Sequence, residues 1–360
     1  MAPTSANHLP RYYPMSEKSV VRYSNLEEQV SKELKWFYVR YMNNARYLYV
    51  DSNYYGIVWP NLILFVVMHL FYFYGLYMVL RIWPVGGMVF CICYGEIAGL
   101  GVTTGAHRLW THRSYEATLP LRIFLCMCHT MAGQNDLYTW VRDHRLHHKF
   151  SETDADPHNS LRGMFFAHVG WLLTRKHPDV MIKGRTIDMS DVINDPVVRF
   201  QRRFYVPLYI FFRFFIPTYL PMRYMNATFS QAFIGLFGTY LGSLHCTWFV
   251  NSLAHWWGTK EYNVKIKPRN NFFVSYITLG EGFHNFHHTF PWDYTIGEFV
   301  WQFNPGQKFI EFWAKIGLAK NLKRATPEQV KNRLENARKI KDQNRLLYEN
   351  DHPYKFPHDY

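Results

Sequence analysis

Asp143-His144-Arg145-Leu146-His147-His148 has the pattern H-x-x-H-H. Residues three and four apart share one face of a helix, so a helix here would present His144, His147 and His148 together. Imidazole is the commonest metal ligand in proteins and suits iron, zinc, copper and nickel. The stretch therefore predicts one wall of a metal site, although a single surface H-x-x-H is more often a solvated pair.

Two further histidine clusters argue against the solvated interpretation. Gly105-Ala106-His107-Arg108-Leu109-Trp110-Thr111-His112 lies upstream, and Glu281-Gly282-Phe283-His284-Asn285-Phe286-His287-His288 lies downstream. Eight of the chain's 18 histidines fall in these three short motifs. His107 and His112 are five residues apart, about 140° around an α-helix, so we expect that the helix ends or bends between them.

A ninth imidazole, His255, stands four residues after Asn251. Nine imidazoles exceed the four ligands of one tetrahedral zinc and are enough for two metals. No cysteine lies in these motifs, which excludes an iron–sulfur cluster. Asp143, Asp156 and Glu281 are candidates for orienting the rings by accepting their second N–H groups. The candidate ligands are His107, His112, His144, His147, His148, His255, His284, His287 and His288, with Asn251 acting directly or through a water.

Long apolar runs alternate with charged ones, which the mean hydropathy of −0.23 conceals. Residues 57–80 contain no charged side chain, and at about 1.5 Å per residue they can cross a hydrocarbon core of about 30 Å. The third run is interrupted by Arg213 and Pro217. We predict an all-α integral membrane protein with a helical cap. Its four spans are 57–80, 85–106, 206–222 and 230–250; the predicted units are an N-terminal segment 1–56, a membrane and catalytic domain 57–318 and a helical tail 319–360.

Basic residues indicate the orientation of these spans. With four spans, 37 of the 40 Lys and Arg residues lie on one side of the membrane, which should be the cytosolic side. Both termini and all three histidine motifs then share that side, so topology can bring the motifs together. The net charge is +13, but no recognisable nucleic-acid-binding module is visible that would explain it. A membrane face or an anionic substrate explains the charge better, and nucleic acid is not an expected partner.

The motifs H-R-L-W-T-H, D-H-R-L-H-H and E-G-F-H-N-F-H-H, with N-S-L-A-H after the fourth span, resemble those of the membrane acyl-CoA desaturases of the stearoyl-CoA Δ9 type. The likeness runs from about residue 61 to 318 and includes Asp154-Ala155-Asp156-Pro157-His158-Asn159. It implies a four-helix endoplasmic-reticulum enzyme with a cytosolic cap and two Fe²⁺ ions. The resemblance makes the nine histidines iron ligands, with Asn251 reaching one metal through water.

The resemblance also implies a reaction and its partners. An O2-dependent enzyme of this kind would insert a cis double bond, at position 9 or 11, into a saturated long-chain fatty acyl-CoA. Cytochrome b5 and its NAD(P)H-dependent reductase would supply electrons, because no fused haem-binding motif is visible. Cationic side chains should meet the CoA phosphates, and an apolar tunnel should hold the chain. The family's substrate positions fall on Asn61, Asn135, Arg142, Asp143, Arg175, Lys176 and Trp248.

Glu96 lies in the middle of the second predicted span, where a charge costs at least ~2.5 kcal/mol. It stands 11 residues before His107, roughly 16 Å along a helix and close to the same face. One hypothesis is that Glu96 helps to set chain length or double-bond position at the far end of the tunnel. A pairing with another helix, for example with Arg213, is the equal alternative.

Two other functions remain open. A fatty-acyl hydroxylase or conjugase would use the same di-iron site, and only product analysis separates it from a desaturase. A metal transporter belongs to another class, but its ligands should lie within the spans near the membrane midplane. The histidines lie instead at or beyond the span ends. A zinc hydrolase would need three ligands and a carboxylate base, which nine imidazoles match poorly.

Overall fold

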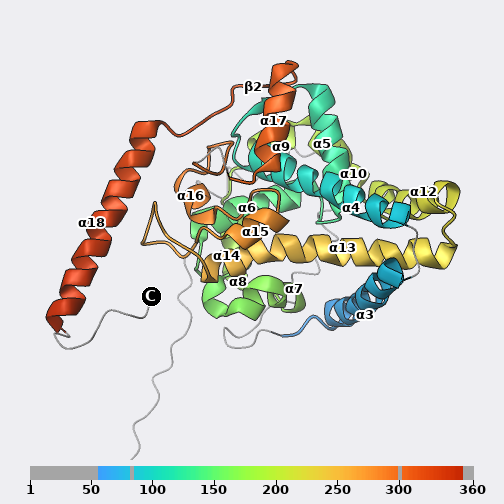
Figure 1. Ribbon diagram of the computed structural model, residues 1–360, viewed down its shortest axis with the longest axis horizontal. Helices are drawn as coiled ribbons and strands as arrows, with labels where there is room; N and C mark the ends of the chain where they lie inside the picture. The colour runs from blue at the N-terminus through green and yellow to red at the C-terminus, as the bar shows by residue number, and fades with distance from the viewer. Residues whose placement is uncertain (1–55, 82–84, 299–301, 352–360) are drawn as a thin grey trace, which may run out of the picture. The chain divides into compact units, whose positions relative to one another are not determined.

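The computed structural model describes residues 56–81, 85–298 and 302–351, which lie in one compact unit, residues 55–360. The predicted N-terminal segment 1–56 therefore lies outside the described residues except for Gly56. The described chain is mostly helical (Figure 1). Its strands, β1 (Glu116–Ala117) and β2 (Ala319–Lys320), form one short antiparallel pair.

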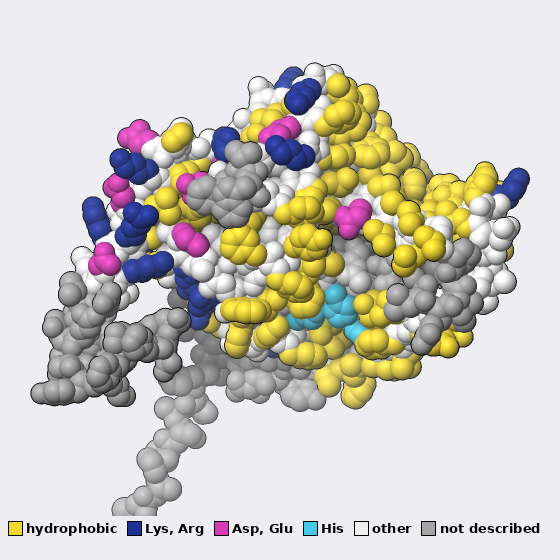
Figure 2. Space-filling model, viewed as in Figure 1, with side chains coloured by type: hydrophobic (Ala, Val, Ile, Leu, Met, Phe, Trp, Pro, Cys, Tyr) yellow, Lys and Arg dark blue, Asp and Glu magenta, His cyan; other side chains and the backbone are white. Residues whose placement is uncertain are grey.

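Three stretches of helix are long and apolar enough to cross a membrane: Trp59–Met78, Val85–Thr111 and Phe229–Trp256. They belong to α3 (Trp59–Arg81), to α4 (Val85–Leu100) with η2 (Gly101–Thr111), and to α13 (Phe229–Asn251) with α14 (Leu253–Trp256). Many of their large apolar side chains are exposed on the protein surface, as expected for helices that face lipid. Figure 2 shows a broad apolar surface over this part of the molecule. The prediction of a membrane protein is confirmed.

α3 and α13 pack against each other in antiparallel fashion. Phe65 meets Trp248 near one end, with ring centroids 5.6 Å apart, and Gly75 meets Ile234 toward the other. A Cβ atom on Gly75 would lie 2.8 Å from the Ile234 carbonyl oxygen, so only glycine allows this approach. Small residues at such crossings let helix backbones come close in membranes.

The predicted third span, 206–222, is not one of the three. This segment divides into α11 (Tyr205–Tyr209), the π-helical η5 (Ile210–Phe215) and α12 (Ile216–Tyr224). Pro217 and Pro221 lie within α12, and proline has no N–H to give to the helix ladder. Arg213 in η5 is buried and donates to the carbonyl oxygens of Met131 and Leu236.

The second span ends between His107 and His112, as predicted: its last helical residue is Thr111, and His112 is the C-cap. The helix changes to a π-helix over Gly101–Thr111, and the N–H of His112 donates to the carbonyl of His107 at 3.1 Å. In a π-helix the bonded residues are five apart, so His107 and His112 lie on nearly the same face. The last π-helical turn thus brings His107 and the C-cap residue His112 to one site.

The remaining helices include α6 and α16, which carry six of the nine histidines. Among these helices, Leu125, Leu137 and Val141 are fully buried, and burial of such side chains is worth about 1.5–3 kcal/mol each. The helix of the C-terminal tail, α18, begins with a capping box, in which the side chains of Thr326 and Gln329 each accept a hydrogen bond from the other's backbone N–H. The elements are α5 (Leu119–Ala132), α6 (Leu137–Phe150), η3 (Ser160–Arg162), η4 (Phe166–Gly170), α7 (Trp171–Leu173), α8 (Pro178–Gly184), α9 (Ser190–Asn194), α10 (Pro196–Arg203), α15 (Phe272–Ile277), α16 (His284–Thr289), α17 (Pro305–Lys315) and α18 (Pro327–Asp351).

Candidate metal centre

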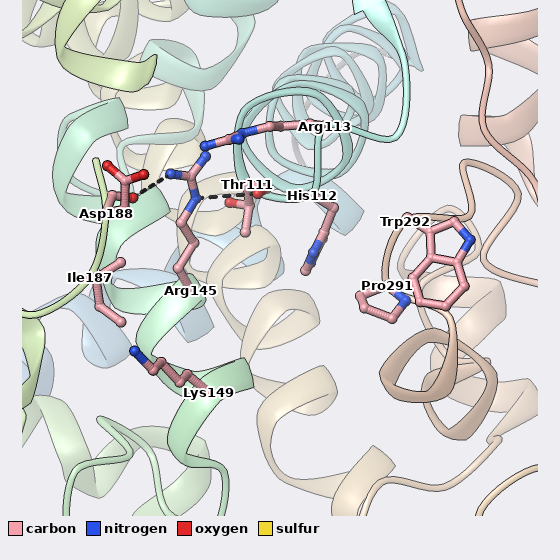
Figure 3. A pocket seen from close by; sticks show the side chains of 9 residues that line it. All are labelled: Thr111, His112, Arg113, Arg145, Lys149, Ile187, Asp188, Pro291 and Trp292. Carbon is pink, nitrogen blue, oxygen red and sulfur yellow. Dashed lines mark hydrogen bonds between the residues drawn. The ribbon is translucent and has the colours of Figure 1, made fainter. Parts of the chain in front are cut away.

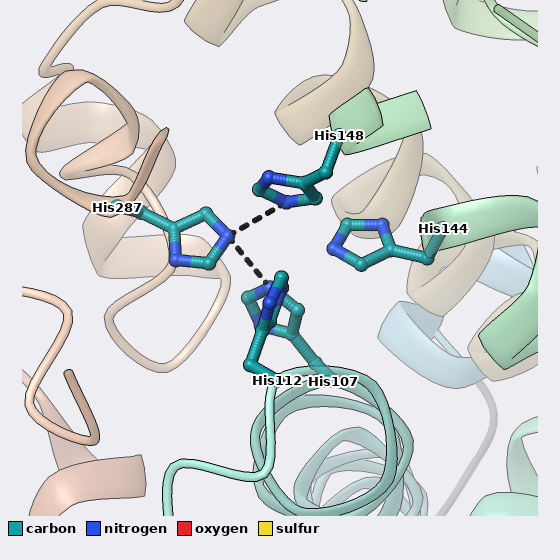
Figure 4. A group of neighbouring side chains, drawn as sticks. All are labelled: His107, His112, His144, His148 and His287. Carbon is teal, nitrogen blue, oxygen red and sulfur yellow. Dashed lines mark hydrogen bonds between the residues drawn. The ribbon is translucent and has the colours of Figure 1, made fainter. Parts of the chain in front are cut away.

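The nine imidazoles singled out by the sequence converge in two groups. Within each group, one ring nitrogen of every member lies within 4.8 Å of those of the others, so that each group could hold a metal ion. The five-histidine group is drawn in Figure 4. It contains His107, His112, His144, His148 and His287, and the four-histidine group contains His147, His255, His284 and His288.

Two helices join the groups. α6 sends His144 and His148 to the five-histidine group and His147 to the four-histidine group. α16 sends His287 to the first group, and His284 and His288 to the second. Neighbouring residues on a helix point about 100° apart, so each H-x-x-H-H motif supplies both groups from one short helix. The two sites are therefore adjacent and built on shared supports.

The ring nitrogens are too crowded to be satisfied by hydrogen bonds alone. Nε2 of His287 lies 3.0 Å from Nε2 of both His107 and His148 (Figure 4). Nε2 of His284 lies 3.1 Å from Nε2 of both His255 and His288. One ring nitrogen carries at most one proton and can donate to one neighbour only. Lone pairs therefore converge at the centre of each group, as metal ligands require.

Three carboxylates orient rings from outside the two groups. Nδ1 of His107 lies 2.7 Å from Glu281, Nδ1 of His147 lies 2.9 Å from Asp156, and Nδ1 of His255 lies 2.8 Å from Glu152. An Nδ1–H bonded in this way leaves Nε2 as the metal ligand and fixes the ring plane. Asp156 and Glu281 are confirmed as partners of histidine rings. Glu152 was missed, although it lies only four residues before Asp156.

Asp143, the third carboxylate expected to orient a histidine ring, pairs with two cationic side chains instead. Its oxygens bond Arg142 at 2.6 Å and Lys176 at 2.7 Å, and these two cations hold its pKa at about 2 although burial acts to raise it. His158 was also not predicted as a site residue; its ring packs at a tilt against that of His147, with centroids 4.3 Å apart. His158 lies in the Asp154–Asn159 run, so its position beside Asp156 was the available signal.

The electrostatics of the groups favour neutral imidazoles. Burial, followed by the charge that neighbouring rings would carry, holds the pKa of the ring well below its usual range for His112, His144 and His148, and likewise for His284, His287 and His288. His147 differs: burial acts to lower its pKa, but Asp156 outweighs burial and the pKa is raised. Neutral rings offer lone pairs to a metal at neutral pH.

The donor set fits a first-row transition metal. Nε2 of both His112 and His144 is buried without a hydrogen-bond partner, and leaving a buried polar atom unpaired costs about 1–3 kcal/mol. A metal ion would satisfy these atoms. All members are imidazoles, a ligand type that suits iron, zinc, copper and nickel rather than magnesium or calcium.

The residues expected to bind substrate divide into two neighbouring sets. Arg142, Asp143 and Lys176 form one charged cluster at the surface of α6. Hydrogen bonds join the start of α3 to α7 and to the segment after it. The Asn61 side chain donates to the carbonyl of Leu172 at 2.7 Å, and the backbone N–H of Arg175 donates to the carbonyl of Gly56 at 3.0 Å.

The other expected site residues are dispersed. Trp248 is buried on α13 against Phe65. Asn135 is exposed between α5 and α6 and has a positive φ of 68°. Asn251 ends α13 and is half-buried.

Glu96 is exposed on α4, and its carboxylate lies close enough to Cys246 of α13 to interact with it electrostatically. The alternative pairing with Arg213 is not formed among the described residues. Arg213 instead lies under the Tyr240 ring, 4.1 Å from its centroid, and bonds two backbone carbonyls. Glu96 is therefore an exposed carboxylate on one membrane-crossing helix, near Cys246 of another.

Membrane-crossing helices that end in two adjacent histidine groups define a class: membrane proteins with a histidine-lined metal centre. Residues 81–295 match the fatty acid desaturase family. The chain is 48% identical over 281 residues to an acyl-CoA Delta-9 desaturase of Acheta domesticus, covering 78% of each chain. It is 47% identical over 274 residues to a stearoyl-CoA desaturase of Homo sapiens, covering 75% of each. The chain belongs to the fatty acid desaturase family.

Proposed function

We propose that the protein is an O2-dependent acyl-CoA desaturase that uses two Fe²⁺ ions to insert a cis double bond, at position 9 or 11, into a saturated long-chain fatty acyl-CoA. The observation that carries the proposal is the pair of all-imidazole groups joined through α6 and α16. The relatives named as acyl-CoA and stearoyl-CoA desaturases support it over most of the chain. In the balanced reaction, R–CH2–CH2–R′, O2, two electrons and two protons give R–CH=CH–R′ and two waters.

Two irons bound by the nine histidines would supply the redox chemistry that O2 reduction and C–H cleavage require. The protein's part is to hold the rings in place and keep water out. Arg108 is buried and donates to Glu281 at 2.9 Å, to the Tyr294 carbonyl and to Asn304, so that Glu281 is fixed against His107. Asp156 and Glu152 do the same for the four-histidine group. Asn251 would reach one metal through a water.

The charged cluster of Arg142, Asp143 and Lys176, with nearby Asn61 and Arg175, would bind the CoA phosphates at the surface. Guanidinium and ammonium groups are the usual partners of phosphate in proteins. Asn135 would bind the substrate near the start of α6, and Trp248 would line the acyl tunnel. Glu96 would lie near the tunnel's far end and influence chain length or double-bond position; its place in the second span, 11 residues before His107, supports this role.

For the topology, we propose four spans in the endoplasmic-reticulum membrane, with both termini in the cytosol. The segment from α11 to α12 would be the fourth crossing, since its helical turns follow one another without a gap. The exposed side chains of Trp256 and Trp257 lie just beyond α13, where an aromatic belt is expected at the membrane interface. Residues 57–318 would form the catalytic domain, with 1–56 and 319–360 as cytosolic extensions.

Two experiments test the proposal. Expression in a yeast strain that lacks its own desaturase should restore unsaturated fatty acids, and mapping of the double bonds by mass spectrometry gives their position. Purified protein should contain two irons per chain. A hydroxylated product would favour the hydroxylase alternative. One zinc per chain with acyl-ester hydrolysis would reject the desaturase, and metal transport without any lipid product would favour the transporter.

A further inference from the structure

A surface pocket of about 380 Å³ borders the five-histidine group (Figure 3). His112 is the one member of either histidine group among the residues that line it. In Figure 3 its ring points into the space between Arg145 and Pro291. The lining residues are Thr111, His112, Arg113, Arg145, Lys149, Ile187, Asp188, Pro291 and Trp292.

His112 connects the pocket to the candidate metal centre. Its Nε2 is buried, has no hydrogen-bond partner and lies within 4.8 Å of ring nitrogens of the other four members of the group. The rest of the ring forms part of the pocket wall (Figure 3). A molecule seated in the pocket would therefore come close to a ligand of the metal without passing through the membrane-crossing helices.

The pocket wall is cationic. Arg113, Arg145 and Lys149 line it, against Asp188 as the lining carboxylate. Arg113 and Arg145 are held by Asp191, at 2.8 and 2.7 Å. Lys149 is exposed; its ammonium lies 5.5 Å from the centroid of the Phe150 ring and forms no salt bridge in the part of the chain that the structure describes. Its ammonium is therefore available to an acidic partner, and Trp292, 39% exposed, offers a flat apolar wall opposite.

This pocket is separate from the charged cluster proposed for CoA. Lys149 and Asp143 both belong to α6 and stand six residues apart, which places them about 120° apart around the helix. Lys176 and Arg142 contact Asp143 on that other face. A partner in the pocket and an acyl-CoA on the charged cluster would approach α6 from different directions.

Resting on the proposed function, we infer that this pocket is the docking site of an acidic electron-donor protein, which delivers electrons beside His112. The desaturation needs two electrons, so two one-electron donors are oxidised for each double bond formed and two protons enter the second water. Complementary charge steers such short-lived redox encounters and raises their association rate. The pocket combines access to a candidate metal ligand, excess positive charge and a lysine, Lys149, without a carboxylate partner among the described residues.

The test compares Lys149→Glu with a matched control, Lys320→Glu, at an exposed lysine of β2. Full-length protein in lipid nanodiscs receives electrons either from reduced cytochrome b5 or from a photoreduced neutral deazaflavin. We expect Lys149→Glu to raise the apparent KM for the cytochrome about fivefold or more at low salt, while the control stays within about twofold. The difference should shrink at about 0.5 M salt, where the charges are screened.

The deazaflavin arm separates docking from damage to the metal centre. Lys149→Glu should give as much product as wild type with deazaflavin and should bind acyl-CoA normally. An unchanged KM for the cytochrome, or a raised KM for acyl-CoA instead, would overturn the docking site. Wild type that forms no product with deazaflavin would instead overturn the desaturase function. Should Lys149→Glu lose metal, zero-length carbodiimide coupling on wild type decides: Lys149 joined to a cytochrome carboxylate supports the site, and its absence from the cross-linked peptides rejects it.

Discussion

Oε2 of Glu281 lies 2.7 Å from Nδ1 of His107, while Oε1 of the same carboxylate accepts from buried Arg108 at 2.9 Å. Burial acts to raise the pKa of Glu281, but His107 and Arg108 together lower it, so the group is a carboxylate at neutral pH. A charged acceptor holds the Nδ1–H of His107 and directs Nε2 into the five-histidine group. The ring's orientation thus depends on a residue 174 positions away in the sequence.

Replacing this acceptor should weaken metal binding without unfolding the protein. Glu281→Gln keeps the size of the side chain and removes its charge. Loss of such an outer partner costs about 10–100-fold in metal affinity or activity. We expect less iron per chain by elemental analysis after dialysis against a weak chelator, and lower activity in proportion. Glu335→Gln on the surface of α18 is the control and should retain its iron. Full iron occupancy in Glu281→Gln would contradict the orienting role.

His129 gives a second prediction, on pH. Its ring is fully buried, both nitrogens lack hydrogen-bond partners, and burial lowers its pKa to about 3. In the unfolded chain the pKa is about 6.5, so below that pH the unfolded state binds the extra proton. This contribution to stability is therefore complete above about pH 6.5 and is lost as the pH falls toward 3, by about 1.4 kcal/mol per pH unit.

His129→Met should remove that part of the acid sensitivity. We expect the thermal midpoint of the variant, followed by size-exclusion fluorescence in detergent, to fall less than that of wild type between pH 6.5 and 4.5. At pH 8 the two proteins should differ little, because a neutral imidazole is replaced by an apolar side chain of similar volume. Parallel curves for the two proteins over the acid range would show that His129 does not titrate on unfolding.

The histidine ligands could be predicted from the sequence because their spacing is local. Helical periodicity places His144, His147 and His148 together whatever the rest of the chain does. The path between His107 and His112 could not be predicted, because the π-helix that aligns them depends on packing against α5 and leaves no spacing pattern that differs from a broken helix. At Gly101, for example, a Cβ atom would lie 2.1 Å from the backbone nitrogen of His129.

Two other kinds of feature were not predicted from the sequence: hydrogen bonds between residues far apart in the chain, and irregular helices. Glu152 bonds His255 across 103 residues, and the local pattern favours Asp143 instead, which directly precedes a histidine motif. Hydropathy also predicted a regular third span from Val206 to Met222, whereas Pro217 and the buried Arg213 divide that segment into three helical pieces. Glu152 meets a residue of a distant helix, which local spacing does not reveal. In the predicted third span the interrupting residues are visible in the sequence, but the carbonyls of Met131 and Leu236 that hold Arg213 come from other helices.

Packing between the first and last membrane-crossing helices supplies a third prediction. Gly75→Val would force side-chain atoms against the Ile234 carbonyl, where even a Cβ would lie 2.8 Å from the oxygen. Overpacking of this kind costs about 1–3 kcal/mol, so the thermal midpoint should fall. Gly86→Val in α4 is the control, since a Cβ there meets nothing within 4 Å. Equal midpoints for the two variants would mean that α3 and α13 do not approach each other at Gly75.

Glu96 supplies the last prediction, which concerns product specificity. Its carboxylate lies in the middle of the second span, 11 residues before His107, and near enough to Cys246 of α13 to influence it electrostatically. If an acyl chain extends from the irons into this region, removing the carboxylate enlarges and dries the end of the tunnel. Each further methylene buried there is worth about 0.8 kcal/mol, a factor of about four in preference.

We therefore expect Glu96→Ala to favour longer acyl chains or a shifted double bond, measured by gas chromatography of fatty acids from the desaturase-deficient yeast. Ile92→Ala, one turn away and exposed on the same helix, should leave the profile unchanged. Identical profiles for Glu96→Ala and wild type would leave Glu96 with a role in helix packing alone.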